Sequence, residues 1–317
     1  MQKKVGIIGC GAVTQNNYVK VLKLYHDMNV KYVHDLNEAL AIDIASQLGA
    51  EVTTKENLLA NSDIVIIATP PSSHYQLIKD SLRKGVKIIC EKPFVGKVAE
   101  CVELVKLAEE SGAELYVAHF RRLYPSVVLA RSIVKSGILG KINSIEVYEG
   151  GKFSWTTQSG YVYKDPYGGV LFDTGSHTID MALYIACLDQ TRLEPSIVNI
   201  QKDKPEPAHD VEANLKLQTE TQNIDLKVKL SRRLLLSNKV RITGEHGFID
   251  VPAVMTNHLR MGTEESSTVI YSDINYDELM DCFAMQFKEM FYEKTDSIFE
   301  ASRFTNLTRV LELIAQN

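Results

Sequence analysis

The chain has 317 residues, a formal net charge of -5 at pH 7 and a hydrophobic fraction of 45%. This length favours two domains, each large enough to bury its own core, and the composition is typical of a soluble globular protein. The mildly acidic balance gives no electrostatic signature of nucleic-acid binding, and no apolar run is long enough to span a bilayer. We therefore expect a cytoplasmic protein with no nucleic-acid or membrane partner.

The 5 cysteines are an odd number and include no CxxC pair. Neither a disulfide framework nor a zinc site is therefore indicated, and we expect buried or neutral thiols in a reducing compartment. No metal site is predicted.

Short apolar runs alternate with amphipathic stretches over the first 120 residues. This alternation is typical of βαβ units that build a parallel sheet. Strands are expected at residues 4–9, 30–34, 64–68, 86–90 and 115–118. The helices between them are expected at residues 18–25, 37–48, 74–83 and 100–111.

After Pro125 the pattern changes to strict alternation of apolar and charged residues, as in 224–230. Such alternation indicates strands with one apolar and one polar face, which are typical of an antiparallel sheet. Similar runs occupy 143–149, 211–217, 239–243 and 248–251, and helices are expected at 127–135, 277–292 and 305–315. We therefore predict an α/β chain with a parallel-sheet domain at residues 1–120 and an α+β domain with a mostly antiparallel open sheet at residues 121–317.

A glycine turn follows the first predicted strand, in the order Gly9-Cys-Gly11-Ala12-Val13-Thr14. The first glycine permits a tight turn, the second lets the backbone approach a pyrophosphate, and the N-terminus of the next helix favours its negative charge. Thr14 stands where the fingerprint usually has a third glycine. Because the turn lies between a strand and a helix, it predicts a dinucleotide-binding Rossmann domain, with Gly9, Gly11, Ala12 and Val13 at the cofactor.

Asp35 follows the second predicted strand, at the distance where an acidic residue binds the adenosine ribose. Its carboxylate would accept hydrogen bonds from the ribose hydroxyls and repel a 2′-phosphate. The next residues, Leu36 and Asn37, supply no cation for such a phosphate. NAD is therefore favoured over NADP. The alternative is a turn aspartate that caps the following helix.

Glu91, Lys92 and Pro93 stand at the end of the strand predicted at 86–90. The carboxyl ends of parallel strands are where open α/β sheets bind their ligands. A lysine there predicts an ammonium group close to the reactive end of the nicotinamide. Pro93 can support a cis peptide bond.

Four motifs carry a family resemblance, at residues 68–74, 90–93, 121–125 and 168–177. In these motifs, and in their order, the chain resembles the Gfo/Idh/MocA oxidoreductases, the family of glucose-fructose oxidoreductase and inositol dehydrogenase. The resemblance implies a nicotinamide dinucleotide on the first domain and a second domain whose sheet often forms dimer or tetramer contacts. We therefore expect a homodimer or homotetramer. Thr14 and Leu123 depart from the family pattern.

The resemblance also implies further cofactor contacts, at Thr69, Pro70, His74 and Glu91. Glu91 could equally pair with a nearby cation.

The resemblance implies that Lys92, Asp173 and His177 are catalytic. The Lys92 ammonium would donate to the reacting hydroxyl and stabilise the developing alkoxide. His177 would exchange the hydroxyl proton, and Asp173 would orient the imidazole or contact a substrate hydroxyl. From local sequence alone, a helix cap and a satisfied histidine remain the alternatives. Asp180 is a candidate to orient His177, with a surface carboxylate as the alternative.

Substrate contacts are expected from Arg122 and from the aromatic segment 151–169, chiefly Trp155 and Tyr163. Aromatic faces would pack against sugar C–H groups, and phenol hydroxyls would bind ring hydroxyls. Arg121 and Arg122 could instead form an interdomain salt bridge, and the aromatic segment could instead pack at an interface.

These residues favour an NAD-dependent dehydrogenase that acts on a secondary hydroxyl, or the corresponding ketone, of a sugar, inositol or nucleotide-linked sugar. One alternative is a glycoside-cleaving or epimerising relative that uses tightly held NAD for transient oxidation. The other is a non-enzymatic regulator responsive to NAD or a sugar, although such proteins tend to lose the catalytic residues.

Overall fold

The computed structural model describes residues 2–152, 160–204, 207–292 and 296–317. They form two compact units. The first consists mainly of residues 2–119 and 283–302, and the second mainly of 120–152, 162–282 and 303–317. Within the described residues, no helix is both long enough and apolar enough to cross a lipid bilayer.

The first unit contains a six-stranded sheet in which all neighbouring strands run parallel. Its order is β3-β2-β1-β4-β5-β6, so the strand order reverses between β1 and β4. The strands are β1 (Lys3–Ile8), β2 (Met28–His34), β3 (Glu51–Val52), β4 (Ile64–Ile67), β5 (Lys87–Glu91) and β6 (Glu114–Ala118). This is the predicted Rossmann sheet, and its reversal point is where such sheets bind ligands.

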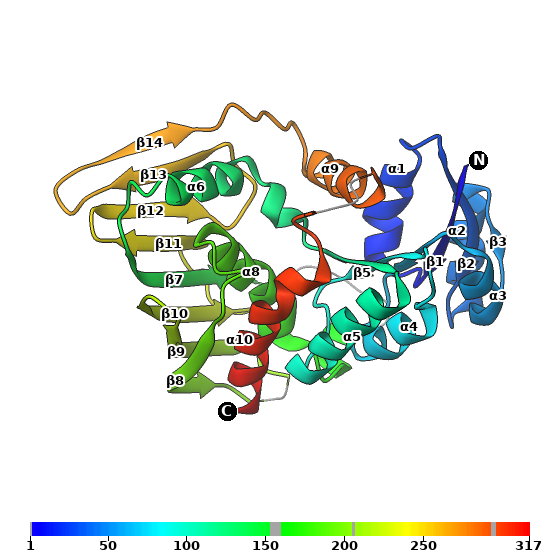
Figure 1. Cartoon of the computed structure of the whole chain (residues 1–317), viewed down its shortest axis with the longest axis horizontal. Helices are drawn as coiled ribbons and strands as arrows, with labels where there is room; N and C mark the ends of the chain where they lie inside the picture. The colour runs from blue at the N-terminus through cyan, green and yellow to red at the C-terminus, as the bar shows by residue number, and fades with distance from the viewer. Residues whose placement is uncertain (1, 153–159, 205–206, 293–295) are drawn as a thin grey trace. The chain divides into compact units, whose positions relative to one another are not determined.

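Helices connect these strands and cover the sheet (Figure 1). They are η1 (Thr14–Tyr18), α1 (Val19–Leu22), α2 (Glu38–Leu48), α3 (Lys55–Asn61), η2 (Pro71–Ser73), α4 (His74–Ser81) and α5 (Val98–Ser111). Helices α4 and α5 pack against each other and against β5 and β6. Helices are present at the predicted places, but α1 ends at Leu22, before the predicted end at Tyr25. The sequence did not predict α3, nor the short strand β3, which has only two residues, both exposed.

A C-terminal segment completes the first unit, where the prediction assigned all of 121–317 to the second domain. In α9 (Leu279–Tyr292), Phe287 packs edge-on against Tyr18, with ring centroids 4.8 Å apart. The Nζ of Lys87 in β5 donates to the carbonyl oxygens of Met290 (2.7 Å) and Phe291 (3.0 Å). The segment Phe283–Ser302 therefore belongs to this unit. Buried aromatic rings hold it there, as does the Lys87 ammonium, which binds the last carbonyls of α9.

The second unit contains an eight-stranded sheet in the order β14-β13-β12-β11-β7-β10-β9-β8. Only β7 and β10 pair in parallel, so the prediction of a mostly antiparallel sheet is confirmed. The strands are β7 (Ile142–Gly150), β8 (Glu194–Lys202), β9 (Asp210–Gln218), β10 (Asn223–Ser231), β11 (Lys239–Gly244), β12 (Gly247–Pro252), β13 (His258–Gly262) and β14 (Ser267–Tyr271).

Alternate residues along β9 and β10 are buried, as the sequence pattern predicts. Helices pack against this sheet in Figure 1. The helical segments of the unit are η3 (Phe120–Leu123), α6 (Pro125–Lys135), α7 (Tyr161–Lys164), η4 (Leu171–Gly175), α8 (Ser176–Ile185), η5 (Ala301–Phe304, whose first two residues belong to the first unit) and α10 (Thr305–Gln316). Between the buried positions of β9 and β10, charged side chains pair across strands, as in Lys216–Asp225 at 2.6 Å.

Candidate active site

Two glycines shape the turn after β1, each for a different reason. Gly9 has a φ of +101°, and a Cβ there would lie 2.5 Å from the backbone oxygen of Ala68. The fold itself therefore requires glycine at this position. At Gly11, a Cβ would meet no atom of the described residues within 4 Å. Folding does not require glycine at this position, and the open space is what the close approach of a pyrophosphate to the backbone would need.

Thr14 and Asp35 fix the conformation of this turn. The Thr14 hydroxyl, fully buried, donates to the carbonyl oxygen of Gly9 at 2.7 Å. This bond explains why a threonine replaces the usual third glycine. The Asp35 Oδ2 accepts from the backbone N–H of Cys10 at 2.7 Å, and Oδ1 accepts from Asn37 N–H at 2.7 Å. Asp35 therefore orders the turn, whereas Asn37 caps α2.

An NAD molecule fits this arrangement of residues. The turn presents open space at Gly11, and a carboxylate oxygen has lone pairs for more than one donor, so Asp35 can also accept from a ribose hydroxyl. The helix that follows places its N-terminus at the turn, where a phosphate is favoured. Among the described residues, no group of His, Cys, Asp and Glu side chains could hold a metal ion.

Lys92 comes directly after β5, at the same edge of the sheet as Gly9 after β1. The two strands flank β4, so only one strand separates the lysine from the reversal point. The Lys92–Pro93 peptide bond is cis, as the sequence allowed. Lys92 is half-buried, while Glu91 and Pro93 on either side are buried.

Glu91 pairs with a tyrosine hydroxyl, which neither sequence interpretation anticipated. The Tyr18 hydroxyl donates to Glu91 Oε1, and the Lys92 N–H donates to Oε2 at 3.0 Å. Burial raises the pKa of Glu91, partly offset by Tyr18 and by the Lys92 charge. Burial and the Glu91 carboxylate together raise the pKa of Tyr18, so the phenol is the donor. Through its backbone contact, Glu91 anchors the peptide that carries Lys92.

His74 bridges the loops that follow β4 and β5. Its Nε2 lies 2.9 Å from the carbonyl oxygen of Thr69, and its Nδ1 lies 3.0 Å from that of Pro93. The ring is fully buried. The Thr69 and Ser73 hydroxyls are hydrogen-bonded at 2.7 Å, next to Pro70. This geometry gives His74 a role in holding the Lys92 loop, distinct from the predicted cofactor contact.

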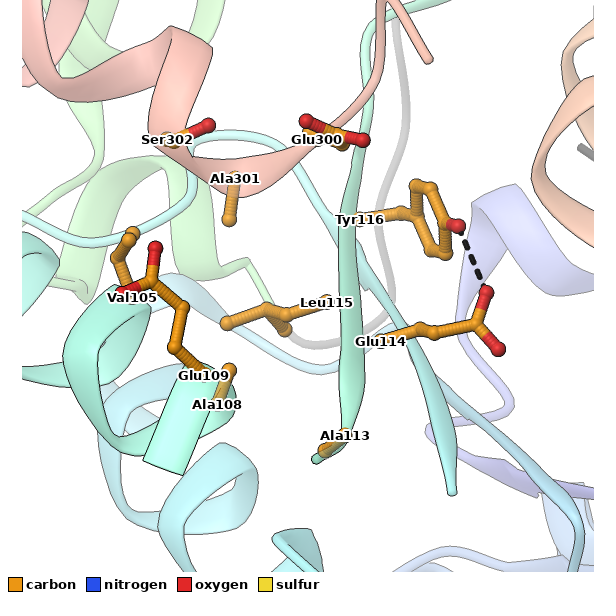
Figure 2. A pocket seen from close by; sticks show the side chains of 10 residues that line it. All are labelled: Val105, Ala108, Glu109, Ala113, Glu114, Leu115, Tyr116, Glu300, Ala301 and Ser302. Carbon is orange, nitrogen blue, oxygen red and sulfur yellow. Dashed lines mark hydrogen bonds between the residues drawn. The ribbon is translucent and has the colours of Figure 1, made fainter. Parts of the chain in front are cut away.

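The first unit also has a hollow of about 260 Å³, which is separate from the residues around the glycine turn and Lys92 (Figure 2). It is lined by the end of α5, the beginning of β6 and residues 300–302, with Glu109, Glu114 and Glu300 among its lining side chains. The Tyr116 hydroxyl donates to Glu114 at 2.9 Å beside it. Residues at the start of β6 are at the opposite edge of a parallel sheet from the strand ends that carry Gly9 and Lys92.

In the second unit, Asp173 and His177 lie on continuous helical turns, in η4 and α8. Asp173 is part of a π-helical turn, and its Oδ2 accepts from Arg232 Nη2 at 2.8 Å. His177 is 8% exposed, and its ring lies edge-on to Phe120 at 5.3 Å. Arg232, at the end of β10, was missed from the sequence because no motif marks it.

Arg122 does not face solvent, which corrects its predicted role as a substrate ligand. Its guanidinium is 1% exposed and binds both oxygens of Asp180, at 2.9 and 2.6 Å. Burial works to lower the pKa of Arg122, but Asp180 and Asp189 raise it overall. Asp180 is therefore neither a surface carboxylate nor shown to orient His177. The predicted interdomain bridge is an ion pair within the second unit.

Arg121 likewise binds residues of the second unit. It binds both carboxylate oxygens of Glu149, at 2.8 and 3.0 Å, and the Ala253 carbonyl at 3.1 Å. Glu149 also accepts from the Thr178 hydroxyl, one residue after His177. This network fixes the first turn of α8.

Of the two aromatic residues predicted to bind substrate, Trp155 lies outside the described residues. Tyr163 in α7 is 52% exposed. Its ring lies 5.9 Å from the Arg232 guanidinium and 6.1 Å from the His209 ring. Tyr163 therefore stands close to the cation that binds Asp173.

Two family models match the chain. One is described as an oxidoreductase family with an NAD-binding Rossmann fold and covers residues 3–119. The other is the GFO/IDH/MocA C-terminal domain and covers residues 127–250.

Curated relatives have related names. An uncharacterized oxidoreductase of Schizosaccharomyces pombe is 33% identical over 136 residues, which are 41% of this chain and 36% of that protein. An inositol 2-dehydrogenase/D-chiro-inositol 3-dehydrogenase of Lactiplantibacillus plantarum is 22% identical over 283 residues, or 84% of this chain and 76% of that protein. The matches to several curated relatives span less than two thirds of their length.

Solved structures share the fold. An inositol dehydrogenase homologue from Azotobacter vinelandii, complexed with NADH and myo-inositol, has a TM-score of 0.81 at 16% identity. The similarity covers 100% of this chain and 95% of that one.

Proposed function

Because the chain belongs to the Gfo/Idh/MocA family of NAD-binding oxidoreductases, we propose that it is an NAD-dependent dehydrogenase. It transfers a hydride between the nicotinamide and a secondary hydroxyl, or the corresponding ketone, of a sugar, inositol or nucleotide-linked sugar. The observation that carries this proposal is Lys92 after β5, at the same sheet edge as the open glycine turn. NAD, when bound, accepts or supplies the hydride.

The chain's own residues handle the proton and the charge on oxygen. The Lys92 ammonium donates to the reacting oxygen and stabilises the negative charge that develops as hydride leaves. His177 takes the hydroxyl proton during oxidation and returns it during reduction. Asp173, held by Arg232, positions a substrate hydroxyl or the imidazole.

Steady-state kinetics with a panel of polyols, sugars and nucleotide-linked sugars tests this assignment. Lys92→Ala and His177→Ala are expected to lower kcat at least about 100-fold, the usual size of a general acid–base or oxyanion contribution. The exposed residues Lys97 and His246 provide matched control substitutions, which should leave kcat nearly unchanged. Near-normal turnover by either site variant would contradict the proposal.

The NAD preference rests on Asp35, whose carboxylate orders the glycine turn. Thermal shift measurements should show stabilisation by NAD at concentrations where NADP has little effect. Greater stabilisation by NADP would contradict this part of the proposal.

The eight-stranded second sheet also leads us to propose a homodimer or homotetramer, as the family resemblance implies. Light scattering coupled to size-exclusion chromatography would measure the mass, and a mass close to one 35.5 kDa chain would contradict it.

A further inference from the structure

Arg232 joins three parts of the second unit through its backbone and its guanidinium group. It follows the last residue of β10, and its backbone N–H donates to the His209 carbonyl at 2.9 Å. Its Nη2 donates both to Asp173 Oδ2 at 2.8 Å and to the carbonyl oxygen of Gly169 at 2.9 Å. The backbone and the side chain of Arg232 are therefore both fixed.

Because the Arg232–Asp173 ion pair is largely buried, its geometry is tightly restricted. The Arg232 side chain is 4% exposed and the Asp173 side chain 16%. A charge-assisted bond in such surroundings is stronger than a bond in water, and the loss of one partner leaves the other charge poorly compensated. The Arg121 guanidinium also interacts electrostatically with Asp173. Two arginines thus favour the charged carboxylate at this position.

Arg232 also contacts residues that precede the Asp173 helix in the chain. Gly169 has a φ of +71° and directly precedes the segment that leads into η4. The Tyr163 ring lies 5.9 Å from the guanidinium. One side chain therefore locates the carboxylate proposed for catalysis and the exposed ring proposed for substrate contact.

We propose that Arg232 is a positioning residue that holds the Asp173 carboxylate charged and in a single orientation for the substrate. This inference rests on the proposed dehydrogenase function. Arg232 acts through Asp173 and does not itself touch the reacting atoms. We expect its removal to lower activity by about 10–100-fold, the range known for buried partners that orient metal-binding side chains.

The neighbouring residue Arg233 offers a matched control. It is 52% exposed and pairs with Asp203 at 2.7 Å, away from Asp173. Arg232→Gln is expected to lower kcat about 10–100-fold while the affinity for NAD, measured by direct titration, stays within about twofold. Arg232→Lys keeps the charge and should recover part of the loss. Arg233→Gln should retain kcat within about twofold of the parent value.

A double-mutant cycle separates this role from a general structural one. If Arg232 acts through Asp173, then Arg232→Gln should lower kcat by less than about threefold in an Asp173→Asn background, because interacting residues are not additive. Multiplicative effects of the two substitutions would overturn the proposal, as would an Arg232→Gln enzyme as active as Arg233→Gln.

Three further outcomes are informative. If Arg232→Gln does not fold, the same cycle is run with Arg232→Lys, and full additivity again overturns the proposal. A parent enzyme that oxidises no polyol or sugar contradicts the proposed function and this inference together. An active parent with an insensitive Arg232 contradicts this inference alone.

Discussion

The glycine turn of the first unit and the Asp173 helix of the second are built from different interactions. Around Gly9 the structure depends on backbone geometry, with short bonds from Thr14 and to Asp35 within about one βαβ unit. Around Asp173 and His177 it depends on buried ion pairs between residues far apart in sequence. Arg122 and Asp180 are separated by 58 positions, and Arg232 and Asp173 by 59.

This difference suggests a division of labour in the proposed reaction. A turn made of backbone can accept a cofactor whose phosphates and ribose are always the same. A site bounded by paired charges can change its substrate by exchange of a few side chains while the helix stays in place. Substitutions that change the glycine turn but not the buried ion pairs, or the reverse, test this difference between the two regions.

The largest expected effect is on the ion pairs. Arg122→Leu removes the guanidinium that binds both oxygens of the buried Asp180 carboxylate, and should lower the free energy of unfolding by about 3–5 kcal/mol. Urea titration measures this change. Arg192, whose side chain is 76% exposed, is the control, and Arg192→Leu should change it by no more than about 0.5 kcal/mol. Equal losses of unfolding free energy in Arg122→Leu and Arg192→Leu would contradict the stabilising role of the buried ion pair.

Two substitutions in the glycine turn should have different effects, one on the free energy of unfolding and the other on NAD affinity. Gly9→Ala introduces a residue at positive φ against the Ala68 carbonyl, and should cost at least about 1–3 kcal/mol of unfolding free energy. Gly11→Ala meets no described atom, so it should fold like the parent but lose NAD affinity. Urea titration and NAD titration of both variants measure the two effects. A Gly11→Ala protein with unchanged NAD affinity would show that the open space is not the pyrophosphate site.

Lys87 places a buried ammonium group in the first unit. Its ammonium binds the last carbonyls of α9 and lies 3.2 Å from Glu114. Lys87→Met should lower the unfolding free energy by about 1–2 kcal/mol, the size of a charge at a partly buried helix C-terminus. The exposed Lys84 is the control. A change no larger than that of Lys84→Met in a urea titration would mean that packing alone holds α9.

The smallest expected effect is the pH dependence due to Glu91. Its pKa is raised in the folded chain, so its contribution to stability is complete below the ordinary glutamate range and is lost as pH rises through the folded value. Glu91→Gln removes this part of the dependence. In urea titrations over a pH series, the stability of Glu91→Gln relative to the parent should rise with pH in this window. A constant difference would contradict the raised pKa.

The sequence predicted those features that depend on local pattern. The parallel strands, the alternation along β9 and β10, and the glycine turn follow from neighbouring residues, and all are present. The Thr14 departure is also local, since its hydroxyl bonds only five residues back.

The partners of the buried charges could not be predicted. From the sequence, Arg122 looks like a residue that binds an anionic substrate. It pairs with Asp180 because η3 packs against α8. Arg232 stands just after a strand end with no motif, and it reaches Asp173 because β10 packs against η4. The docking of Phe283–Ser302 on the first unit depends on Tyr18 and Lys87, which lie more than 200 residues earlier.

The most direct test of the central claim is the transfer of deuterium from a polyol to NAD. The enzyme is incubated with NAD and a substrate deuterated at the reacting carbinol carbon, and the cofactor is analysed by mass spectrometry. We expect reduced cofactor that carries one deuterium, with little formed by Lys92→Ala. Cofactor that stays oxidised while the sugar is converted and retains or regains its label would contradict net dehydrogenation.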